Sequence, residues 1–160
     1  MTELLDGAAA QDTDKTGAND LEEMKAFFEK DYFAFRQAGI EIVEAQRGDE
    51  THPPRAKCIM PVTENHLNAS GFVMGGAIFT LADLTASVAS NAGQPNTVTE
   101  GGQIRYLRGA DCKMLTADAV AVFSGKKTNY CEVTVTDENG TLIAKASFSG
   151  FRILQDREKK

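Results

Sequence analysis

The apolar and polar positions form their most unusual pattern between residues 65 and 92. Across this stretch, and on to Glu100, Asp83 is the only aspartate, glutamate, lysine or arginine. From Ala77 to Ala92 the apolar residues do not keep to one face at helical spacing. They lie on all sides of the axis: Ala77, Ile78, Phe79, Leu81, Ala82, Leu84, Ala86, Val88 and Ala89. This pattern predicts a helix that is buried on most of its sides.

The polar residues of this predicted helix form one narrow stripe. They are spaced three or four residues apart, which places them on the same side. They are Thr80, Asp83, Ser87 and Ser90. A carboxylate on a largely buried helix is costly unless it receives hydrogen bonds or its pKa rises. Asp83 is therefore a candidate functional residue, and the alternative is a structural acid satisfied by the hydroxyl groups of Thr80 or Ser87.

An earlier helix is predicted over residues 21–37, with Asp20 as its N-cap and Gly39 at its end. Its apolar residues recur at helical spacing and form an aromatic-rich packing face. They are Leu21, Met24, Phe27, Phe28, Tyr32 and Phe35. Two strands follow, at 40–45 and 55–62, separated by turn residues.

After the central helix, β-rich runs bounded by turns predict four consecutive strands. They are 97–107, 115–123, 128–136 and 141–153. Turn residues at 124–127 and the pair Asn139-Gly140 predict two tight hairpins. Gly101-Gly102 indicates a bulge, or a close approach of another backbone, in the first of these strands. Together the elements predict an α+β fold in which an antiparallel sheet wraps around one long central helix.

The composition agrees with one globular domain. The chain has 160 residues, of which 42% are hydrophobic and 25% charged, and its net charge is −6. We expect an acidic, weakly ordered tail at 1–20, the domain at 21–154 and a charged tail at 155–160. No stretch carries the basic cluster that nucleic-acid binding requires, so nucleic acid is excluded as a partner.

The sequence also argues against a metal, a disulfide or a membrane span. Cys58, Cys112 and Cys131 lie far apart, and neither histidine has metal-site spacing relative to them. We therefore expect buried free thiols, no metal site and no cofactor. Polar residues interrupt the apolar helix, which argues against a membrane span. Because the first residues lack the apolar run of a signal peptide, we expect a cytoplasmic protein.

Two motifs carry a family resemblance. The first is Asn68-x-x-Gly71-x-x-Met74-Gly75-Gly76, followed by Leu81-Ala82-Asp83, and the second is Gln103-Ile104-Arg105-Tyr106-Leu107-Arg108. These motifs and the order of elements over 21–153 resemble the hotdog-fold acyl-CoA thioesterases of the phenylacetate-degradation type. The resemblance implies a hotdog fold and hydrolysis of an acyl-CoA to free acid and CoA. It also implies a homodimer or homotetramer with the site at the dimer interface.

Physical chemistry independently supports acyl transfer at the start of the central helix. Gly75 and Gly76 lie where backbone N–H groups lack helical partners and the helix dipole is positive. Glycine lets a carbonyl oxygen approach these donors, each of which is typically worth about 2.7–4 kcal/mol to an acyl-transfer transition state. Asp83 is about two turns further along the helix. The donors of a neighbouring subunit are therefore better placed to complete its site.

The resemblance implies catalytic roles for four residues. Asp83 of one subunit would act as nucleophile or general base, and both mechanisms stay open. From the other subunit, the Gly75 N–H would bind the carbonyl oxygen, and Asn68 would polarise the carbonyl or hold the attacking water. Thr99 lies where the family often has a Ser or Thr that contacts the acid or the water. The structural alternatives are a turn-forming Asn68 and an ordinary strand threonine.

Further residues are candidates for substrate binding. Gly76 and Met74 flank the predicted oxyanion donor, and Met74 replaces a histidine that family members usually carry. CoA bears phosphates, so we also expect basic residues at the rim of the site. The candidates are Lys126, Lys127 and Arg108, with Arg105 as an alternative on the same strand. His66 is expected to cap or pack rather than to catalyse.

Two other functions remain open at this level. One is a non-catalytic acyl-CoA binding or regulatory module on the same fold, which the replacement of the family histidine by Met74 favours. The other is a hydratase or dehydratase of acyl thioesters, which the absence of a histidine in or beside the helix disfavours. The sequence does not identify the acyl group, and it does not distinguish CoA from a carrier protein.

Overall fold

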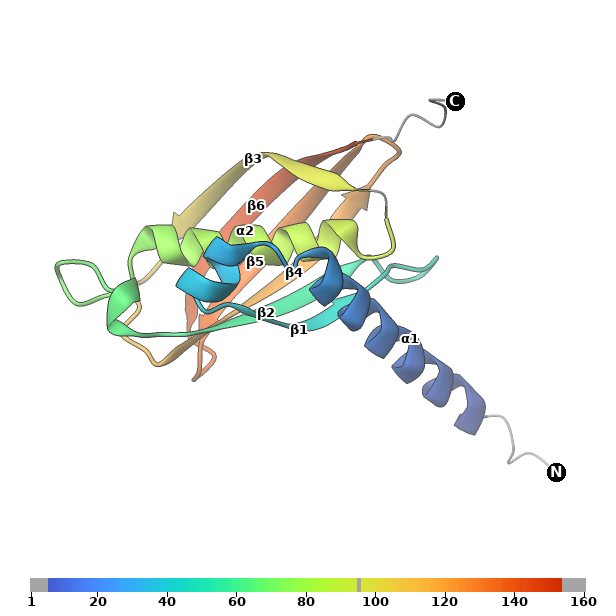
Figure 1. The fold of residues 1–160 in the computed structure, drawn as a ribbon, viewed down its shortest axis with the longest axis horizontal. Helices are drawn as coiled ribbons and strands as arrows, with labels where there is room; N and C mark the ends of the chain where they lie inside the picture. The colour runs from blue at the N-terminus through green and yellow to red at the C-terminus, as the bar shows by residue number, and fades with distance from the viewer. Residues whose placement is uncertain (1–5, 95, 154–160) are drawn as a thin grey trace.

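A computed structural model of the chain describes residues 6–94 and 96–153, and Figure 1 shows a curved sheet with one long helix lying along its concave side. The elements in chain order are α1 (Asp6–Phe27), the π-helical segment η1 (Phe33–Gln37), β1 (Glu41–Gln46), β2 (Arg55–Pro61), the 3₁₀ segment η2 (Glu64–His66), α2 (Gly75–Asn91), β3 (Thr97–Tyr106), β4 (Met114–Ser124), β5 (Thr128–Asp137) and β6 (Leu142–Arg152). Every predicted strand is present, and each end agrees with the prediction to within one residue.

The six strands form one antiparallel sheet in the order β1-β2-β4-β5-β6-β3. The hairpin predicted from Asn139-Gly140 joins β5 to β6, and Gly140 adopts a φ of +79°, which glycine tolerates without strain. The chain passes from α2 to the far edge of the sheet, where β3 pairs with β6. Strands β1 and β3 are therefore the two edges, and the bulge predicted near Gly101-Gly102 falls between Thr99 and Gly101.

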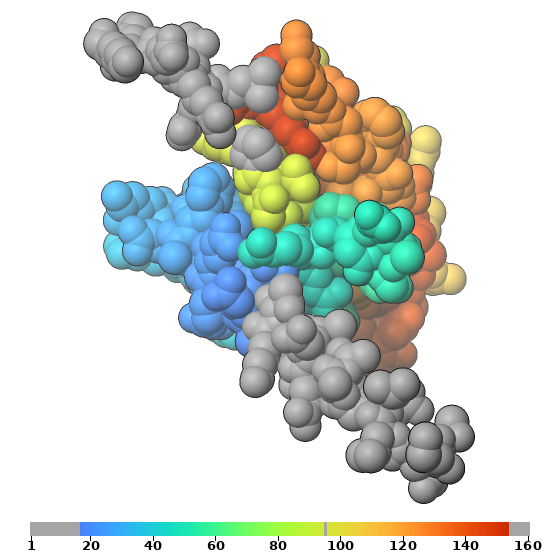
Figure 2. Space-filling view, turned by 90° about the vertical axis from the view of Figure 1, so that its right-hand side faces the viewer, coloured from blue at the N-terminus to red at the C-terminus, as the bar shows by residue number. Residues whose placement is uncertain are grey.

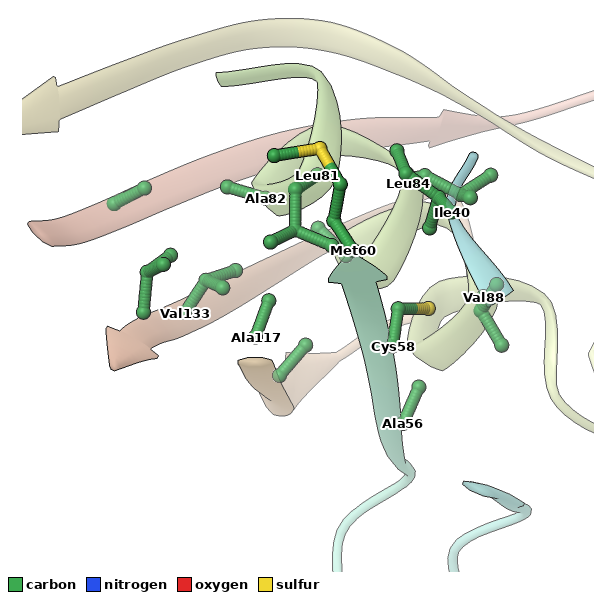
Figure 3. Packing of buried hydrophobic residues seen from close by; sticks show 14 of the residues in the cluster. Ile40, Ala56, Cys58, Met60, Leu81, Ala82, Leu84, Val88, Ala117 and Val133 are labelled. Carbon is green, nitrogen blue, oxygen red and sulfur yellow. The ribbon is translucent and has the colours of Figure 1, made fainter. Parts of the chain in front are cut away.

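The core lies between α2 and the inner face of the sheet. Strand β4 alternates buried and partly buried residues from Met114 to Ala121, as a strand with one covered face does. Figure 3 shows helix residues Leu81, Ala82, Leu84 and Val88 meeting the strand residues Ala56, Cys58, Met60, Ala117 and Val133, with Ile40 beside them. Many strand residues here are small, so the helix packs close to the sheet. Full burial of Leu81 alone stabilises the fold by about 1.5–3 kcal/mol.

The N-terminal segment differs from its prediction. Helix α1 begins at Asp6, well before the predicted start, and ends at Phe27, so the predicted helix 21–37 is split between α1 and η1. Asp20 is not an N-cap, because its buried carboxylate lies inside the helix and accepts hydrogen bonds from the backbone N–H (2.9 Å) and Nε (2.5 Å) of Arg47. This ion pair fastens α1 to the end of β1. The predicted tails at 1–20 and 155–160 lie wholly or partly outside the described residues.

Figure 2 looks at the end of the molecule where α2 finishes, and there segments distant in sequence come together. The end of α1, the loop between β1 and β2 and the turn after α2 are neighbours on this surface. Gly93 in that turn has a φ of +66°, and the Arg47 side chain lies 2.7 Å from the position a Cβ would take. None of the described helices is both long and apolar enough to cross a membrane.

Candidate active site

Asp83 lies on the most open side of α2. Its side chain is partly buried, whereas its helix neighbours Ala82 and Leu84 are buried. The hydroxyl of Thr99, on the facing strand β3, donates a 3.0 Å hydrogen bond to Oδ1 of Asp83. Burial raises the pKa of Asp83 above its ordinary value, the Thr99 hydrogen bond lowers it, and the negative charge of Asp31 raises it. The net shift is upward, which makes this carboxylate a stronger base than an exposed one.

A groove of about 440 Å³ opens beside Asp83. One wall is the segment 30–34, which contains Tyr32 and Phe33, and the other is the polar stripe of α2 with Thr80 and Ser87. Tyr32 and Phe33 are 49% and 67% exposed, so the groove has an aromatic rim. The sequence pattern predicts a packing face that includes Tyr32 but not Phe33, and it carries no sign that segment 30–34 meets the stripe of α2.

The start of α2 carries the second half of the predicted chemistry. Met74 is the N-cap and makes no side-chain hydrogen bond to the helix. No described residue accepts a hydrogen bond from the N–H of Gly75 or Gly76, and Gly76 is exposed. The phenol of Tyr106 on β3 donates a 2.7 Å hydrogen bond to the carbonyl of Gly75. Two free amides with a positive dipole end behind them form an arrangement that can bind an oxyanion.

The loop before α2 is built on His66. This residue is buried, its Nδ1 accepts a hydrogen bond from the backbone N–H of Thr63 (2.9 Å), and its Nε2 donates to the carbonyl of Ala38 (3.0 Å). The backbone N–H of Met74 donates in turn to the His66 carbonyl (2.7 Å). The prediction that His66 caps and packs is therefore confirmed, and its bond to Ala38 ties the loop to the end of η1.

Asn68 lies at the start of the exposed loop. Its Oδ1 accepts hydrogen bonds from the backbone N–H groups of Ser70 (2.9 Å) and Phe72 (3.2 Å), which is a turn-forming role. Its amide group donates to no described residue. Among the described residues of this chain, no hydrogen bond joins Asn68 to Asp83. Met74, the N-cap of α2, is 53% exposed.

The two halves of the predicted site are separated along α2. Gly75 and Asp83 are eight residues apart on one helix, which corresponds to about 12 Å along the axis. A single thioester carbonyl cannot contact both from one subunit. The structure thus brings Thr99 to Asp83 and Tyr106 to Gly75, at two different places along β3.

The predicted basic residues also do not converge. Arg108 donates to the carbonyl of Leu142 at the beginning of β6, and the carbonyl of Lys127 accepts from Arg152 at its end. A strand of this length spans about 33 Å, so Arg108 and the exposed pair Lys126 and Lys127 mark opposite ends of the molecule. Among the described residues, no group of three or more His, Cys, Asp or Glu could hold a metal ion.

Comparisons with known proteins show the family of the chain. Residues 70–144 match the model of the thioesterase superfamily. A provisionally named esterase of Archaeoglobus fulgidus is 31% identical over 137 residues, which cover 85% of each chain. The 1,4-dihydroxy-2-naphthoyl-CoA hydrolase of Listeria monocytogenes is 32% identical over 108 residues, which cover 66% of this chain and 83% of the hydrolase.

Solved structures give the same result. The PaaI protein of the E. coli phenylacetic acid degradation operon has a TM-score of 0.78 at 25% identity, over 87% of this chain and 96% of that one. The smu.793 protein of Streptococcus mutans, solved with acetyl-CoA bound, has a TM-score of 0.65 at 30% identity, over 71% and 88%.

The fold, with its sheet curved around one long helix, is therefore the hotdog fold, as the sequence predicted. The chain belongs to the thioesterase superfamily. Its similar proteins include an acyl-CoA hydrolase and a protein that binds acetyl-CoA. These findings confirm the resemblance in fold and family, while the roles of individual residues stay predictions.

Proposed function

We propose that this protein hydrolyses an acyl-CoA thioester to the free acid and CoA. The observation that carries the proposal is the partly buried carboxylate of Asp83, which has a raised pKa, a hydrogen bond from Thr99 and a groove beside it. Carboxylates with a perturbed pKa that lie in a groove cluster at functional sites. The name of the Listeria relative and the acetyl-CoA in the Streptococcus protein support a CoA thioester as substrate.

We infer that the site is completed by a second copy of the chain. Strand β3 is an edge strand, and none of the described strands pairs with its outer side. Suppose that the β3 strands of two copies pair antiparallel, with the two-fold axis between Gly102 and Gln103. Thr99 and Tyr106 lie about equally far from this axis on opposite sides, so Thr99 of one copy comes close to Tyr106 of the partner subunit. Thr99 contacts Asp83 and Tyr106 contacts Gly75. The pairing therefore brings Asp83 of one subunit toward Gly75 of the partner subunit.

In the resulting site each group has a role in thioester hydrolysis. The free N–H group of Gly75 receives the developing negative charge on the carbonyl oxygen. In one route Asp83 attacks the carbonyl carbon and the C–S bond breaks; water then hydrolyses the mixed anhydride, which frees the acid, restores the carboxylate and supplies the proton for the CoA sulfur. In the other route Asp83 takes a proton from the water that attacks the carbonyl carbon, and passes this proton to the sulfur as CoA leaves. Thr99 holds Asp83 in place, and Asn68 donates its free amide to the carbonyl or the water.

The remaining candidates would contact CoA itself. Met74 and Gly76 flank the N–H group of Gly75, and both residues are exposed. Lys126 and Lys127 are exposed and are suited to phosphate groups. Because Arg108 lies at the other end of β6, it serves the same CoA only if it comes from the partner subunit.

The decisive experiment measures release of free thiol from a panel of acyl-CoA esters with a thiol-reactive dye. Wild-type protein should turn over at least one ester, and Asp83→Ala should lower kcat by about 10²–10⁴-fold, the range for a positioned acid–base group. Asp111→Ala is the matched control, since Asp111 is exposed and does not line the groove. Size-exclusion chromatography should give the same oligomer for all three proteins.

Two outcomes would contradict the proposal. Wild-type turnover by Asp83→Ala would remove Asp83 from the mechanism. Tight binding of acyl-CoA with no thiol release by the wild-type protein would favour a non-catalytic acyl-CoA binding module instead.

A further inference from the structure

We propose that Tyr106 is a positioning residue for the oxyanion donors: its phenol holds the Gly75–Gly76 peptide group so that the Gly76 N–H joins the Gly75 N–H at the thioester oxygen. The inference rests on the proposed thioesterase function and deepens it, because Gly76 then takes part in stabilising the transition state. Neither the motif nor the spacing of residues had given Tyr106 any role.

The hydrogen bond itself is the first argument. Tyr106 donates to the carbonyl oxygen of Gly75 at 2.7 Å. That carbonyl and the N–H of Gly76 belong to one planar peptide group. Fixing the oxygen therefore fixes the direction of the N–H on the other side of the plane. A hydrogen bond accepted by the carbonyl also polarises the peptide and strengthens its N–H as a donor.

The packing around Gly75 is the second argument. A Cβ added at Gly75 would stand 3.0 Å from both the Cζ and the phenol oxygen of Tyr106. The tyrosine ring thus lies against the helix backbone where any other residue would carry a side chain. Met74, the N-cap, provides no side-chain hydrogen bond to the helix start. Tyr106, which lies on β3, instead restrains the backbone at the start of α2.

The position of Tyr106 along β3 is the third argument. Thr99 and Tyr106 lie on the side of β3 that faces α2, one bonded to Asp83 and the other to the carbonyl of Gly75. A single strand therefore holds both the acid and the amide donors of one subunit. Strand β3 is also the edge strand at which a second copy of the chain would pair. The strand therefore fixes the acid of one subunit relative to the amide donors of the partner subunit.

The test is Tyr106→Phe, which removes the hydroxyl and keeps the ring. We expect kcat for a good acyl-CoA to fall about tenfold, equivalent to about 1.4 kcal/mol of barrier, with KM changed less than about twofold. Tyr130→Phe is the matched control, because Tyr130 lies on β5, away from α2, and its hydroxyl contacts no described residue. Its kinetic constants should equal those of the wild type.

A second readout does not depend on turnover. In NMR spectra, Tyr106→Phe should move the carbonyl carbon resonance of Gly75 and the amide resonance of Gly76, while Tyr130→Phe leaves both in place. Unchanged resonances would show that the bond is absent in solution and would overturn the proposal. Shifted resonances with unchanged kcat would also overturn it, since the restraint would then have no part in catalysis.

The outcomes also separate this inference from the proposed function. If wild-type protein hydrolyses acyl-CoA, Asp83→Ala is inactive and Tyr106→Phe is fully active, only the role of Tyr106 fails. If wild-type protein hydrolyses no thioester, the proposed function fails and the role of Tyr106 fails with it.

Discussion

The hydroxyl of Thr99 on β3 donates a 3.0 Å hydrogen bond to Oδ1 of Asp83 on α2. This bond stabilises the charged carboxylate and lowers its pKa, while burial raises the same pKa. The two effects oppose each other, so Thr99 sets the pH range over which Asp83 can act as a base or nucleophile.

Thr99→Val should therefore shift the pH dependence of turnover. Valine has nearly the same shape but no hydroxyl, so the pKa of Asp83 should rise further. Activity that needs the carboxylate is lost as the pH falls through this pKa, and the acidic limb of the kcat/KM profile should move to higher pH. We also expect kcat to fall about tenfold, since a hydrogen bond to a charged group contributes about 1.5–3 kcal/mol.

The control for this experiment is Thr116→Val, a partly buried threonine of β4 with no hydrogen bond from its side chain to a described residue. Its pH profile should match that of the wild type. An acidic limb that stays in place in Thr99→Val would show that this limb does not report the titration of Asp83.

The two adjacent glycines of β3 should differ sharply in stability tests. A Cβ at Gly102 would stand 2.5 Å from the ring of Phe148, whereas one at Gly101 would meet only Oγ of Ser149 at 3.5 Å. Gly102→Ala should lower the free energy of unfolding by about 1–3 kcal/mol through overpacking. Gly101→Ala should change it by less than about 0.5 kcal/mol, the range for surface substitutions. Urea denaturation of the two variants checks this, and equal losses would contradict it.

The cysteine thiols should be unreactive in the folded protein. Cys58 and Cys131 are fully buried, and burial raises the pKa of Cys58 to about 12 and raises that of Cys131 as well. Burial also raises the pKa of the partly exposed Cys112, as do the charges of Glu138 and Asp137. Because the thiolate is the reactive species, a thiol dye should label native protein slowly. All three thiols should react at once in denaturant, and rapid labelling of Cys58 or Cys131 in the native protein would show that the strands open.

Much of the fold follows from local patterns. Apolar and polar residues alternate along the strands, and residues that favour tight turns separate one strand from the next. The strand ends are therefore predictable from turn residues such as Asn139 and Gly140. The central helix is recognisable because it is apolar on nearly every side and therefore needs a sheet around it. The start of α1 was not predictable, since Asp20 resembles an N-cap in sequence. Only the structure shows that its carboxylate instead binds Arg47, after β1.

The sequence by itself determined that a single acid lies on a buried helix and that two glycines begin that helix. The family resemblance pointed to Thr99 as a contact of the acid, and only the tertiary structure showed that Tyr106 meets Gly75. Thr99 and Tyr106 reach Asp83 and Gly75 because β3 crosses to the far edge of the sheet and pairs with β6. The physical reason is that a residue's neighbours along the chain decide its local conformation and the face it occupies. The register of one element against another depends instead on packing of the whole core, which no local pattern contains.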